Sequence, residues 1–331
     1  MNALVLKKPG APDTLTLSEL PMPIPDKGEI RVRVYAVGLN PVDYKVAANG
    51  HPAWEYPFIL GLDVAGTVDE VGADVTDWTV GDRVVYHGNL TKPGGYAEYG
   101  ITTSHTVAAI PEGISFVDAA AFPCAGLTAY QAIQRKMSMH LRTGQSILIH
   151  GGAGGVGGYA LQLARIYGAS KIITTASASS FGHVRALGAD ICIDYNHEDV
   201  YQRVMDATDG QGVDFILNTI NRSTAQKDLS MLTFGGQLTC IAGAPENVAD
   251  FQPGNRTFTL HKTALGGAHG SGNIQAEEDL ARMAEEFMQL MLDGKINAMV
   301  KEVIPLVGVP AALTRIASRH VQGKIVAKLL L

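Results

Sequence analysis

The feature that most constrains the fold is the glycine-rich stretch 150–157, which reads HGGAGGVG. It follows the apolar run 147–149 and precedes an amphipathic run from Tyr159 to Tyr167. A strand, a glycine turn and a helix in this order are typical of a dinucleotide-binding unit. The context, more than the glycines alone, therefore predicts a nucleotide site in the middle of this chain.

Three of these glycines have the G-x-G-x-x-G spacing, namely Gly152, Gly154 and Gly157. At this spacing the first glycine allows the tight turn and the second lets a pyrophosphate approach the backbone. The third permits close packing of the helix on the strand. The helix N-terminus adds free N–H groups and the positive end of the helix dipole, both of which favour phosphates.

Composition limits the class of protein. The chain has 331 residues, which suits two domains better than one core. It is 46% hydrophobic and 18% charged, as globular proteins are, and its net charge of -6 gives no reason to bind nucleic acid or anionic lipid. The 3 cysteines are widely spaced, and we see no leader peptide and no membrane-spanning apolar run. We expect a cytoplasmic protein without disulfides.

The pattern of elements changes along the chain. The first third is β-rich, with strands expected at 1–8, 29–37, 64–71, 83–86 and 95–101, and helices capped by Asn40 and Ser115. The middle third alternates strands at 147–149, 171–175, 191–193, 213–218 and 237–241 with helices at 155–167, 179–187, 199–207 and 223–232. The remainder suggests a helix at 276–292, a helix from about Pro310 and a strand at 325–330.

Alternating strands and helices predict a parallel sheet covered on both faces. We therefore expect an α/β chain with a dinucleotide-binding domain at 125–264, inserted between the two pieces of a second domain at 1–124 and 265–331. A cleft between the two domains is the expected ligand site.

The second strand of the nucleotide domain indicates which dinucleotide binds. An acidic residue at its end, about 20 residues after the glycines, would bind the ribose of NAD. Here the strand ends at 174–180 as TTASASS, without a carboxylate. Small hydroxyl residues leave room for the extra phosphate of NADP, so the sequence favours NADPH. Alternatively, Ser177, Ser179 and Ser180 cap the next helix, and the two interpretations are compatible.

Seven motifs occur in the order found in one family. They are GLNPVDYK at 38–45, GLDVAGTV at 61–68, VGDRV at 80–84, GYAEY at 95–99, AGLTA at 125–129, the glycine stretch, and GKIV at 323–326. The chain thus resembles the medium-chain dehydrogenase/reductase superfamily, in its zinc-free quinone oxidoreductase branch. The resemblance implies a Rossmann-type doubly wound parallel sheet and a GroES-like β-rich catalytic domain. It also implies a homodimer and a small-molecule quinone or enone substrate.

The zinc-dependent branch of this superfamily has a cysteine where this chain has Asn40 and a histidine where it has Leu62. Cys124 corresponds to a third ligand position, but one sulfur cannot hold a tetrahedral zinc ion. We therefore expect no metal. Without a Lewis acid, reduction of an electrophilic quinone or enone is easier than dehydrogenation of an unactivated alcohol.

The resemblance also implies which residues bind the cofactor. It places Gly152 and the run 154–157 at the pyrophosphate, Thr128 near the nicotinamide ribose, and Ser177 and Tyr195 near the adenosine ribose. Gly243 and the run ending in Ala268 would border the nicotinamide, and Lys324 would close over the cofactor. The cofactor-binding set is Thr128, Gly152, Gly154, Gly155, Val156, Gly157, Ser177, Tyr195, Gly243, Ala268 and Lys324.

One departure from the family affects the NADP phosphate. Some quinone reductases have a lysine where this chain has Ser180. His183 and Arg185 are the basic residues nearby that could replace it.

Hydride transfer to a conjugated carbon puts negative charge on the carbonyl oxygen, which needs preorganised hydrogen-bond donors. Asn40, Tyr44 and Lys45 follow a predicted strand and are the candidate catalytic residues. Each has another interpretation: Asn40 before proline is a good helix cap, Tyr44 can be a wall aromatic, and Lys45 can be solvated. His87 lies in the glycine-rich loop 86–95 and is either a proton relay or a surface histidine without a role. Asp63 is interpreted as structural.

The sequence leaves three hypotheses of function. The first is a zinc-independent NADPH reductase of quinones or α,β-unsaturated carbonyls. The second is an NADPH-binding structural or regulatory member of the family with little turnover. The third is a zinc alcohol dehydrogenase with unusual ligands.

Overall fold

The computed structural model describes residues 1–248, 257–318 and 321–329. They form two compact units: the first comprises Met1–Leu127 and Leu265–Leu331, and the second comprises Thr128–Ala264. The expected end of the last strand, Leu330, lies outside the described residues. Within the described ranges, no helix combines the length and the apolar character that crossing a membrane requires.

The strands and helices have the following bounds. The strands are β1 (Asn2–Leu6), β2 (Thr16–Glu19), β3 (Glu29–Gly38), β4 (Phe58–Ile59), β5 (Asp63–Val71), β6 (Arg83–His87), β7 (Tyr99–Thr103), β8 (Ala108–Ala109), β9 (Ser146–Ile149), β10 (Lys171–Ala176), β11 (Ile191–Asp194), β12 (Val213–Asn218), β13 (Leu232–Cys240), β14 (Phe258–Lys262), β15 (Val300–Pro305) and β16 (Lys324–Lys328). The α-helices are α1 (Pro41–Asn49), α2 (Phe116–Ala121), α3 (Pro123–Tyr130), α4 (Gly155–Ile166), α5 (Phe181–Ala186), α6 (Val200–Ala207), α7 (Arg222–Asp228), α8 (Ile274–Leu292) and α9 (Val309–Ala317). Short 3-10 turns include η2 (Ser104–Thr106), η5 (Ala178–Ser180), η6 (Leu229–Met231) and η7 (Leu265–Gly270).

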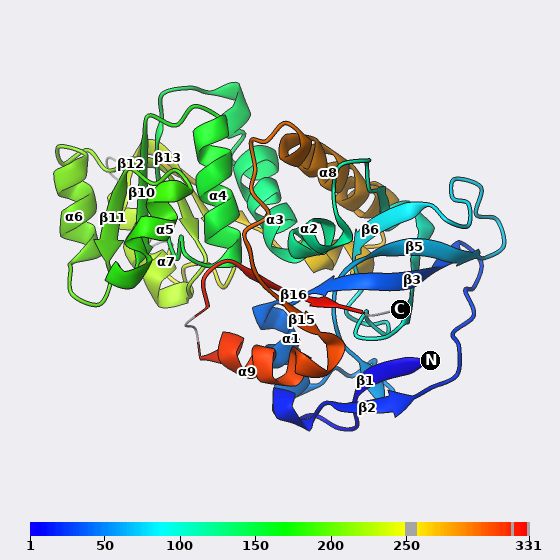
Figure 1. Cartoon of the computed structure of the whole chain (residues 1–331). Helices are drawn as coiled ribbons and strands as arrows, with labels where there is room; N and C mark the ends of the chain where they lie inside the picture. The colour runs from blue at the N-terminus through cyan, green and yellow to red at the C-terminus, as the bar shows by residue number, and fades with distance from the viewer. Residues whose placement is uncertain (249–256, 319–320, 330–331) are drawn as a thin grey trace. The chain divides into compact units, whose positions relative to one another are not determined.

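The second unit is built on a parallel sheet with the strand order β11-β10-β9-β12-β13-β14 (Figure 1). Helices α4, α5, α6 and α7 pack against its strands. Its core includes buried side chains from five strands, among them Leu148, Ile173, Ile193, Ile216 and Leu238. The strand order reverses between β9 and β12, and in such sheets ligands bind at the carboxyl ends of the strands beside this point. The α/β fold class expected from the sequence is confirmed.

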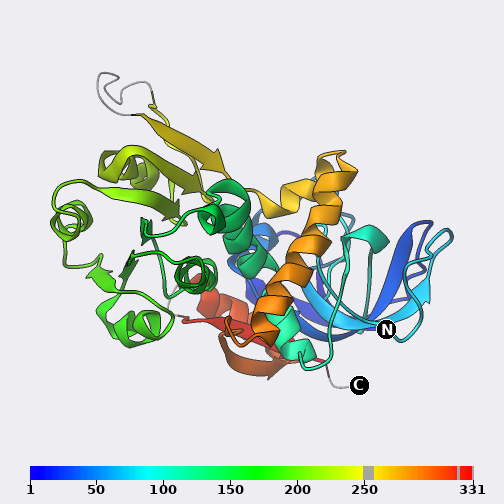
Figure 2. The same cartoon turned by 90° about the horizontal axis from the view of Figure 1, so that it is seen from above.

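The first unit contains a mainly antiparallel sheet with the order β15-β16-β3-β5-β6-β8, in which β7 also pairs with β3. A smaller sheet has the order β2-β1-β4. In the larger sheet Val326 and Asp63 both pair with Gly38, from opposite sides of β3. The start of β5, the end of β3 and the start of β16 therefore lie together. The long helix α8 packs on β6, β8 and η2 of this unit, and Figure 2 shows its full length in orange.

The elements that were predicted from hydrophobic periodicity or from a helix cap are observed in the structure. Along β3 the residues Ile30, Val32, Val34 and Ala36 are fully buried, as the alternation predicts. The N-cap of α2 is Ser115, whose side chain accepts the N–H of Asp118 at 3.0 Å.

Other elements differ from the prediction. The helix expected to reach Leu232 ends at Asp228, because residues 229–231 tighten into η6 and the next strand begins at Leu232. The strand expected at 95–101 is observed at 99–103. Strands β14 and β15, which lie at the edges of their sheets and are mostly half-buried or exposed, were not predicted.

Candidate functional site

The glycine turn after β9 begins with a left-handed residue. Gly151 has a φ of 69°, a conformation in which a Cβ would be strained. Its N–H donates to Thr175 Oγ1 at 3.0 Å, and the N–H of Gly152 donates to the Thr175 carbonyl at 3.1 Å. The left-handed residue of the turn is therefore Gly151, one position before the first glycine of the G-x-G-x-x-G spacing, and the turn is tied to the end of β10.

The glycines at the predicted spacing are needed for different steric reasons. A Cβ on Gly157 would lie 2.2 Å from the Gly151 carbonyl oxygen, and one on Gly152 would lie 2.2 Å from Thr174 Oγ1. A Cβ on Gly154 would meet nothing nearer among the described residues than the Gly151 oxygen, at 3.5 Å. The protein itself has no steric need for glycine at 154, whereas a phosphate seated on the turn would need that space.

Helix α4 opens directly from this turn. Gly154 is its N-cap, so no side chain caps the helix, and its first turn contains no acidic residue. Gly155, Val156 and Gly157 form that turn. The first N–H groups of a helix have no partner within the helix and carry its positive dipole end. The residues of the turn therefore fit a pyrophosphate.

The end of β10 carries hydroxyls and no carboxylate. Ser177 is the N-cap residue of η5, but its side chain makes no capping hydrogen bond; its Oγ lies 3.1 Å from the hydroxyls of Ser179 and Ser180. Side-chain capping by Ser177, the alternative considered from the sequence, is therefore not observed. Tyr195 follows β11 and is 57% exposed. The Arg185 guanidinium lies 5.5 Å from the Phe181 ring centroid, within α5.

In the first unit, Asn40, Asp63 and Lys324 form a buried polar cluster, although the chain separates Asn40 from Lys324 by 284 residues. The Asn40 amide Nδ2 donates to Asp63 Oδ2 at 2.7 Å, and its Oδ1 accepts from Lys324 Nζ at 2.5 Å. Lys324 Nζ also donates to the Leu39 carbonyl at 3.0 Å and lies 3.8 Å from Asp63 Oδ2. The side chain of Asn40 is thus held on both of its polar atoms.

Two buried carboxyls share the charge of this one ammonium. Burial raises the pKa of Asp63 to about 7, although Lys324 and the hydrogen bonds from Asn40 and Cys124 oppose this. Burial raises the pKa of Asp43 to about 6, against hydrogen bonds from the Asn40 N–H at 2.8 Å and the Tyr96 hydroxyl at 2.9 Å. Lys324 therefore balances a group that would otherwise lose its charge.

Next to this cluster, Asp63, His87 and Cys124 each offer one potential metal ligand, and these atoms lie within 4.8 Å of one another. The environment opposes a divalent cation in three ways. Both Asp63 oxygens already accept hydrogen bonds, from Asn40 Nδ2 and the Cys124 N–H. The Lys324 ammonium is 3.8 Å away from one of them. Burial and the neighbouring carboxylate raise the pKa of the Cys124 thiol far above its usual range.

His87 is not the surface histidine that the sequence suggested. It is the last residue of β6, it pairs with Asp63 across the sheet, and it is 5% exposed. Burial, and then its neighbours His269 and Lys324, lower its pKa to about 3, so the ring is neutral near pH 7. Its Nδ1 is buried and has no hydrogen-bond partner among the described residues.

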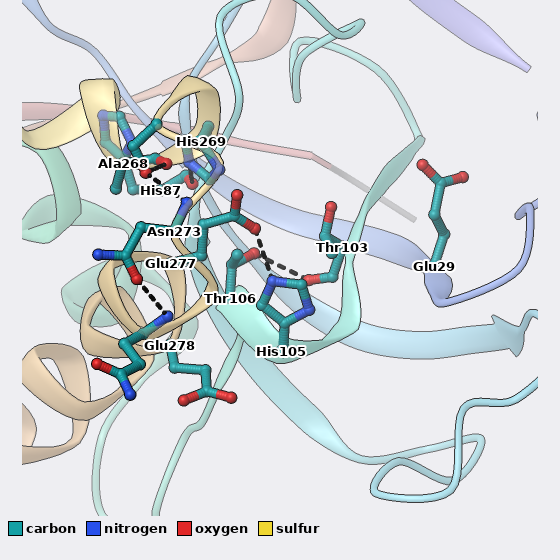
Figure 3. Close-up of polar contacts among 12 residues, drawn as sticks. Glu29, His87, Thr103, His105, Thr106, Ala268, His269, Asn273, Glu277 and Glu278 are labelled. Carbon is teal, nitrogen blue, oxygen red and sulfur yellow. Dashed lines mark hydrogen bonds and ion pairs between the residues drawn. The ribbon is translucent and has the colours of Figure 1, made fainter.

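His269 of η7 holds His87 from one side (Figure 3). The two rings stack with centroids 6.0 Å apart and an interplanar angle of 14°. His269 Nε2 lies 3.0 Å from the His87 carbonyl oxygen, to which it donates. Behind this pair, His105 Nε2 contacts Glu277 Oε2 at 2.6 Å and ties η2 to α8. These contacts fix the position of the His87 ring.

The other predicted site residues are dispersed. Of the three catalytic candidates, Asn40 joins the polar cluster, Tyr44 packs half-buried against the core, and Lys45 is exposed on α1. Lys324, expected over the cofactor, is buried among protein acceptors of the first unit.

The remaining cofactor candidates lie in both units. In the second, Thr128 is buried in α3, and Gly243 follows β13 with a φ of 138°. Ala268 lies in η7 of the first unit.

Asp63, interpreted from the sequence as structural, is a central member of the polar cluster, and its pairing with Lys324 was not predicted. A usable signal was present, because each is a charged residue at the start of an otherwise apolar strand, in the stretches DVAGTV and KIVA. Charged side chains in such runs are rarely buried unless they are paired. What the signal could not supply was the identity of the partner.

Known proteins resemble this chain over nearly its whole length. Residues 26–112 match the family described as "Alcohol dehydrogenase GroES-like domain", and residues 155–288 match "Zinc-binding dehydrogenase". A quinone oxidoreductase of Pseudomonas aeruginosa is 32% identical over 322 residues, which cover 96% of each chain.

Solved structures resemble it equally well. Escherichia coli quinone oxidoreductase, solved in complex with NADPH, superposes with a TM-score of 0.88 at 28% identity and covers 99% of this chain and 100% of that one. The CurK enoyl reductase gives a TM-score of 0.86 at 28% identity and covers 99% of both chains.

Proposed function

Because the chain belongs to the medium-chain dehydrogenase/reductase superfamily, in its quinone oxidoreductase-like branch, we propose that it is an NADPH-dependent reductase of quinones or α,β-unsaturated carbonyls. It transfers hydride without a metal ion. The observation that carries the proposal is the uncapped N-terminus of α4 beside a β10 end that has no carboxylate. A homodimer is part of the proposal, on the grounds of the family.

Two observations favour NADPH over NADH: the absence of an acidic residue at the end of β10, and the cofactor bound in a solved structure of a similar protein. An acidic residue at the end of β10 would repel a 2′-phosphate, and the first acidic residue after this strand is Asp190. The Escherichia coli relative was solved with NADPH. When bound, NADPH supplies a hydride from the nicotinamide ring. Besides the residues of the turn, we propose that Thr128, Ser177, Tyr195, Gly243 and Ala268 contact it.

In the first unit the polar cluster prepares a hydrogen-bond donor. Lys324 holds Asn40 Oδ1 and Asp63 holds one Nδ2 hydrogen, so the amide plane is fixed. The second Nδ2 hydrogen has only a weak contact, to the Gly38 carbonyl at 3.4 Å. We propose that this N–H donates to the substrate oxygen as negative charge develops there. Lys324 is then a positioning residue in addition to its predicted place at the cofactor.

We propose that solvent supplies the proton that completes the reduction, and that neither His87 nor His269 donates it as a histidinium ion. The lowered pKa of His87, about 3, keeps its ring neutral, so it offers a hydrogen bond and not a mobile proton. The pKa of His269 is also lowered by burial. The pH profile of turnover should therefore show no loss of activity caused by deprotonation of either histidine. Solvent is the proposed source of the proton.

One observation favours the rival metal-dependent function, namely the convergence of Asp63, His87 and Cys124. The ammonium of Lys324 and the hydrogen bonds that both Asp63 oxygens already accept oppose it. Elemental analysis of the purified protein decides between the two. Stoichiometric zinc that supports turnover and is removed by a chelator would revive the zinc dehydrogenase and contradict the proposal.

Turnover is tested by following NADPH absorbance at neutral pH with a panel of benzoquinones, naphthoquinones, alkenals and cyclic enones, with NADH in parallel. A primary isotope effect with NADPH deuterated at the transferred position identifies hydride transfer. The variants Tyr44→Phe and Lys45→Ala are assayed beside Asn40→Ala, and we expect the largest loss for Asn40→Ala. Tight NADPH binding without oxidation by any acceptor would instead support a structural or regulatory protein.

A further inference from the structure

A buried polar network lies beneath the glycine turn, made of His150, Thr175, Asn218 and Asp228; we name it the turn network. Their exposed fractions are 3%, 3%, 0% and 0%, respectively. Buried polar groups without partners are costly, so a core that retains four of them must satisfy them well. The network belongs entirely to the second unit.

The hydrogen bonds of the turn network connect Asp228, through His150 and Thr175, to the backbone of the turn. His150 Nε2 lies 2.8 Å from Asp228 Oδ1, and a carboxylate accepts, so Nε2 carries the proton. On the other side of the ring, His150 Nδ1 lies 3.3 Å from the Thr175 hydroxyl, within hydrogen-bond distance. Thr175 Oγ1 in turn accepts the N–H of Gly151 at 3.0 Å. One histidine thus links Asp228 to the hydroxyl that is the acceptor for the left-handed residue of the turn.

The far end of the network is anchored in β12. Asn218 Nδ2 donates to Asp228 Oδ2 at 2.6 Å, and Asn218 Oδ1 accepts the N–H of Ile220 at 2.9 Å. Thr219 Oγ1 donates to the His150 carbonyl at 2.8 Å. The network therefore joins the carboxyl ends of β9, β10 and β12, which surround the point where the strand order reverses.

We propose that the turn network positions the glycine turn for the dinucleotide, with Thr175 and His150 acting as positioning residues through the Gly151 N–H. The inference rests on the proposed function, since it assumes that this turn binds NADPH. Left-handed glycine turns can adopt several orientations, and a fixed acceptor for Gly151 selects one of them. A site held in its bound geometry binds more tightly because less ordering remains to be done on binding.

The chain offers a matched control at the neighbouring residue. Thr174 is also fully buried in β10, and its hydroxyl donates to the Ile149 carbonyl at 2.7 Å. That hydroxyl makes no hydrogen bond to the turn. Thr174→Val and Thr175→Val therefore each replace one buried hydroxyl by a methyl group in the same strand, but only Thr175→Val removes the acceptor of Gly151.

The experiment measures the NADPH dissociation constant by fluorescence titration, together with KM, kcat and Tm. For Thr175→Val we expect the dissociation constant and the KM for NADPH to rise about tenfold with kcat nearly unchanged, which corresponds to the loss of one ordinary hydrogen bond. Thr174→Val should change them less than about twofold at a comparable loss of Tm. Thr175→Ser keeps the hydroxyl and should restore binding.

A second substitution tests the same proposal if the Thr175→Val variant folds poorly. His150→Gln keeps an amide N–H for Asp228 but has no polar atom at the position of the ring Nδ1 that contacts Thr175, and it should also weaken NADPH binding. Equal effects of Thr174→Val and Thr175→Val, or full affinity in His150→Gln, would overturn the role of the network. Absence of NADPH binding by the unmodified protein would instead overturn the proposed function, so the two failures are distinguishable.

Discussion

Replacing Lys324 by methionine tests whether its ammonium holds the polar cluster of the first unit. Methionine keeps an unbranched chain of similar length but has no donor. The Leu39 carbonyl and Asn40 Oδ1 would each lose their bond to Nζ, now 3.0 and 2.5 Å long. Asp63, 3.8 Å away, would lose its neighbouring cation.

The expected destabilisation follows from these contacts. A buried acceptor without a partner costs about 1–3 kcal/mol, and removal of one member of a buried ion pair costs about 3–5 kcal/mol. These costs overlap because they concern the same groups, so we expect a loss of about 4 kcal/mol at pH 8. For a unit of about 200 residues, at about 2–4 °C per kcal/mol, Tm should fall by about 8–16 °C.

The loss should depend on pH. Lys324 lowers the pKa of Asp63, which burial raises to about 7, so its removal raises that pKa further. A carboxyl whose pKa is raised in the folded state favours folding at low pH, and this contribution is lost as the pH rises through the folded pKa. The deficit of the Lys324→Met variant should therefore be larger at pH 8 than at pH 5.5, by up to about 1.4 kcal/mol, because pH 8 lies about one unit above the Asp63 pKa of the unmodified protein.

Tryptophan fluorescence reports on the unfolding of the first unit, which contains Lys324. The chain has 2 tryptophans, Trp54 and Trp78, and both lie in the first unit. Urea unfolding followed at these residues, at both pH values, gives the two free energies. Lys328→Met is the matched control, because Lys328 is exposed on the same strand. A loss below about 1 kcal/mol, or an equal loss at pH 5.5 and pH 8, would refute the reasoning.

Three further predictions follow from other contacts. Gly154→Ala should weaken NADPH binding at least tenfold with little change in Tm. Gly157→Ala should instead lower Tm strongly, because its Cβ would lie 2.2 Å from a backbone oxygen. NADPH titration and thermal unfolding of the two variants check these expectations. With wild-type protein, kcat/KM should fall as the pH drops through about 7, because protonation of Asp63 weakens its hold on Asn40; a pH profile that Asp63→Asn leaves unchanged would contradict this. Ser115→Ala should cost about 1 kcal/mol through loss of the α2 cap, and unchanged urea unfolding of this variant would count against it.

Local signals made much of the fold predictable. The glycine turn, the alternation along β3 and the cap at Ser115 each express a short-range rule of backbone geometry or burial, and each is confirmed. Strands β14 and β15 were missed because they lie at the edges of their sheets and are mostly half-buried or exposed, so burial leaves little mark on their sequences. The helix expected to reach Leu232 was too long because η6 replaces its last turn.

The sequence by itself indicated the order of most helices and strands and the place of the glycine turn, because both depend on residues close together in the chain. Only the tertiary structure decided which polar side chains meet. Asn40, Asp63 and Lys324 converge because β16 and β5 flank β3, and His150 meets Asp228, 78 residues later, through the parallel sheet. Sequence patterns record which residues are buried, but strand order decides which buried charges become partners.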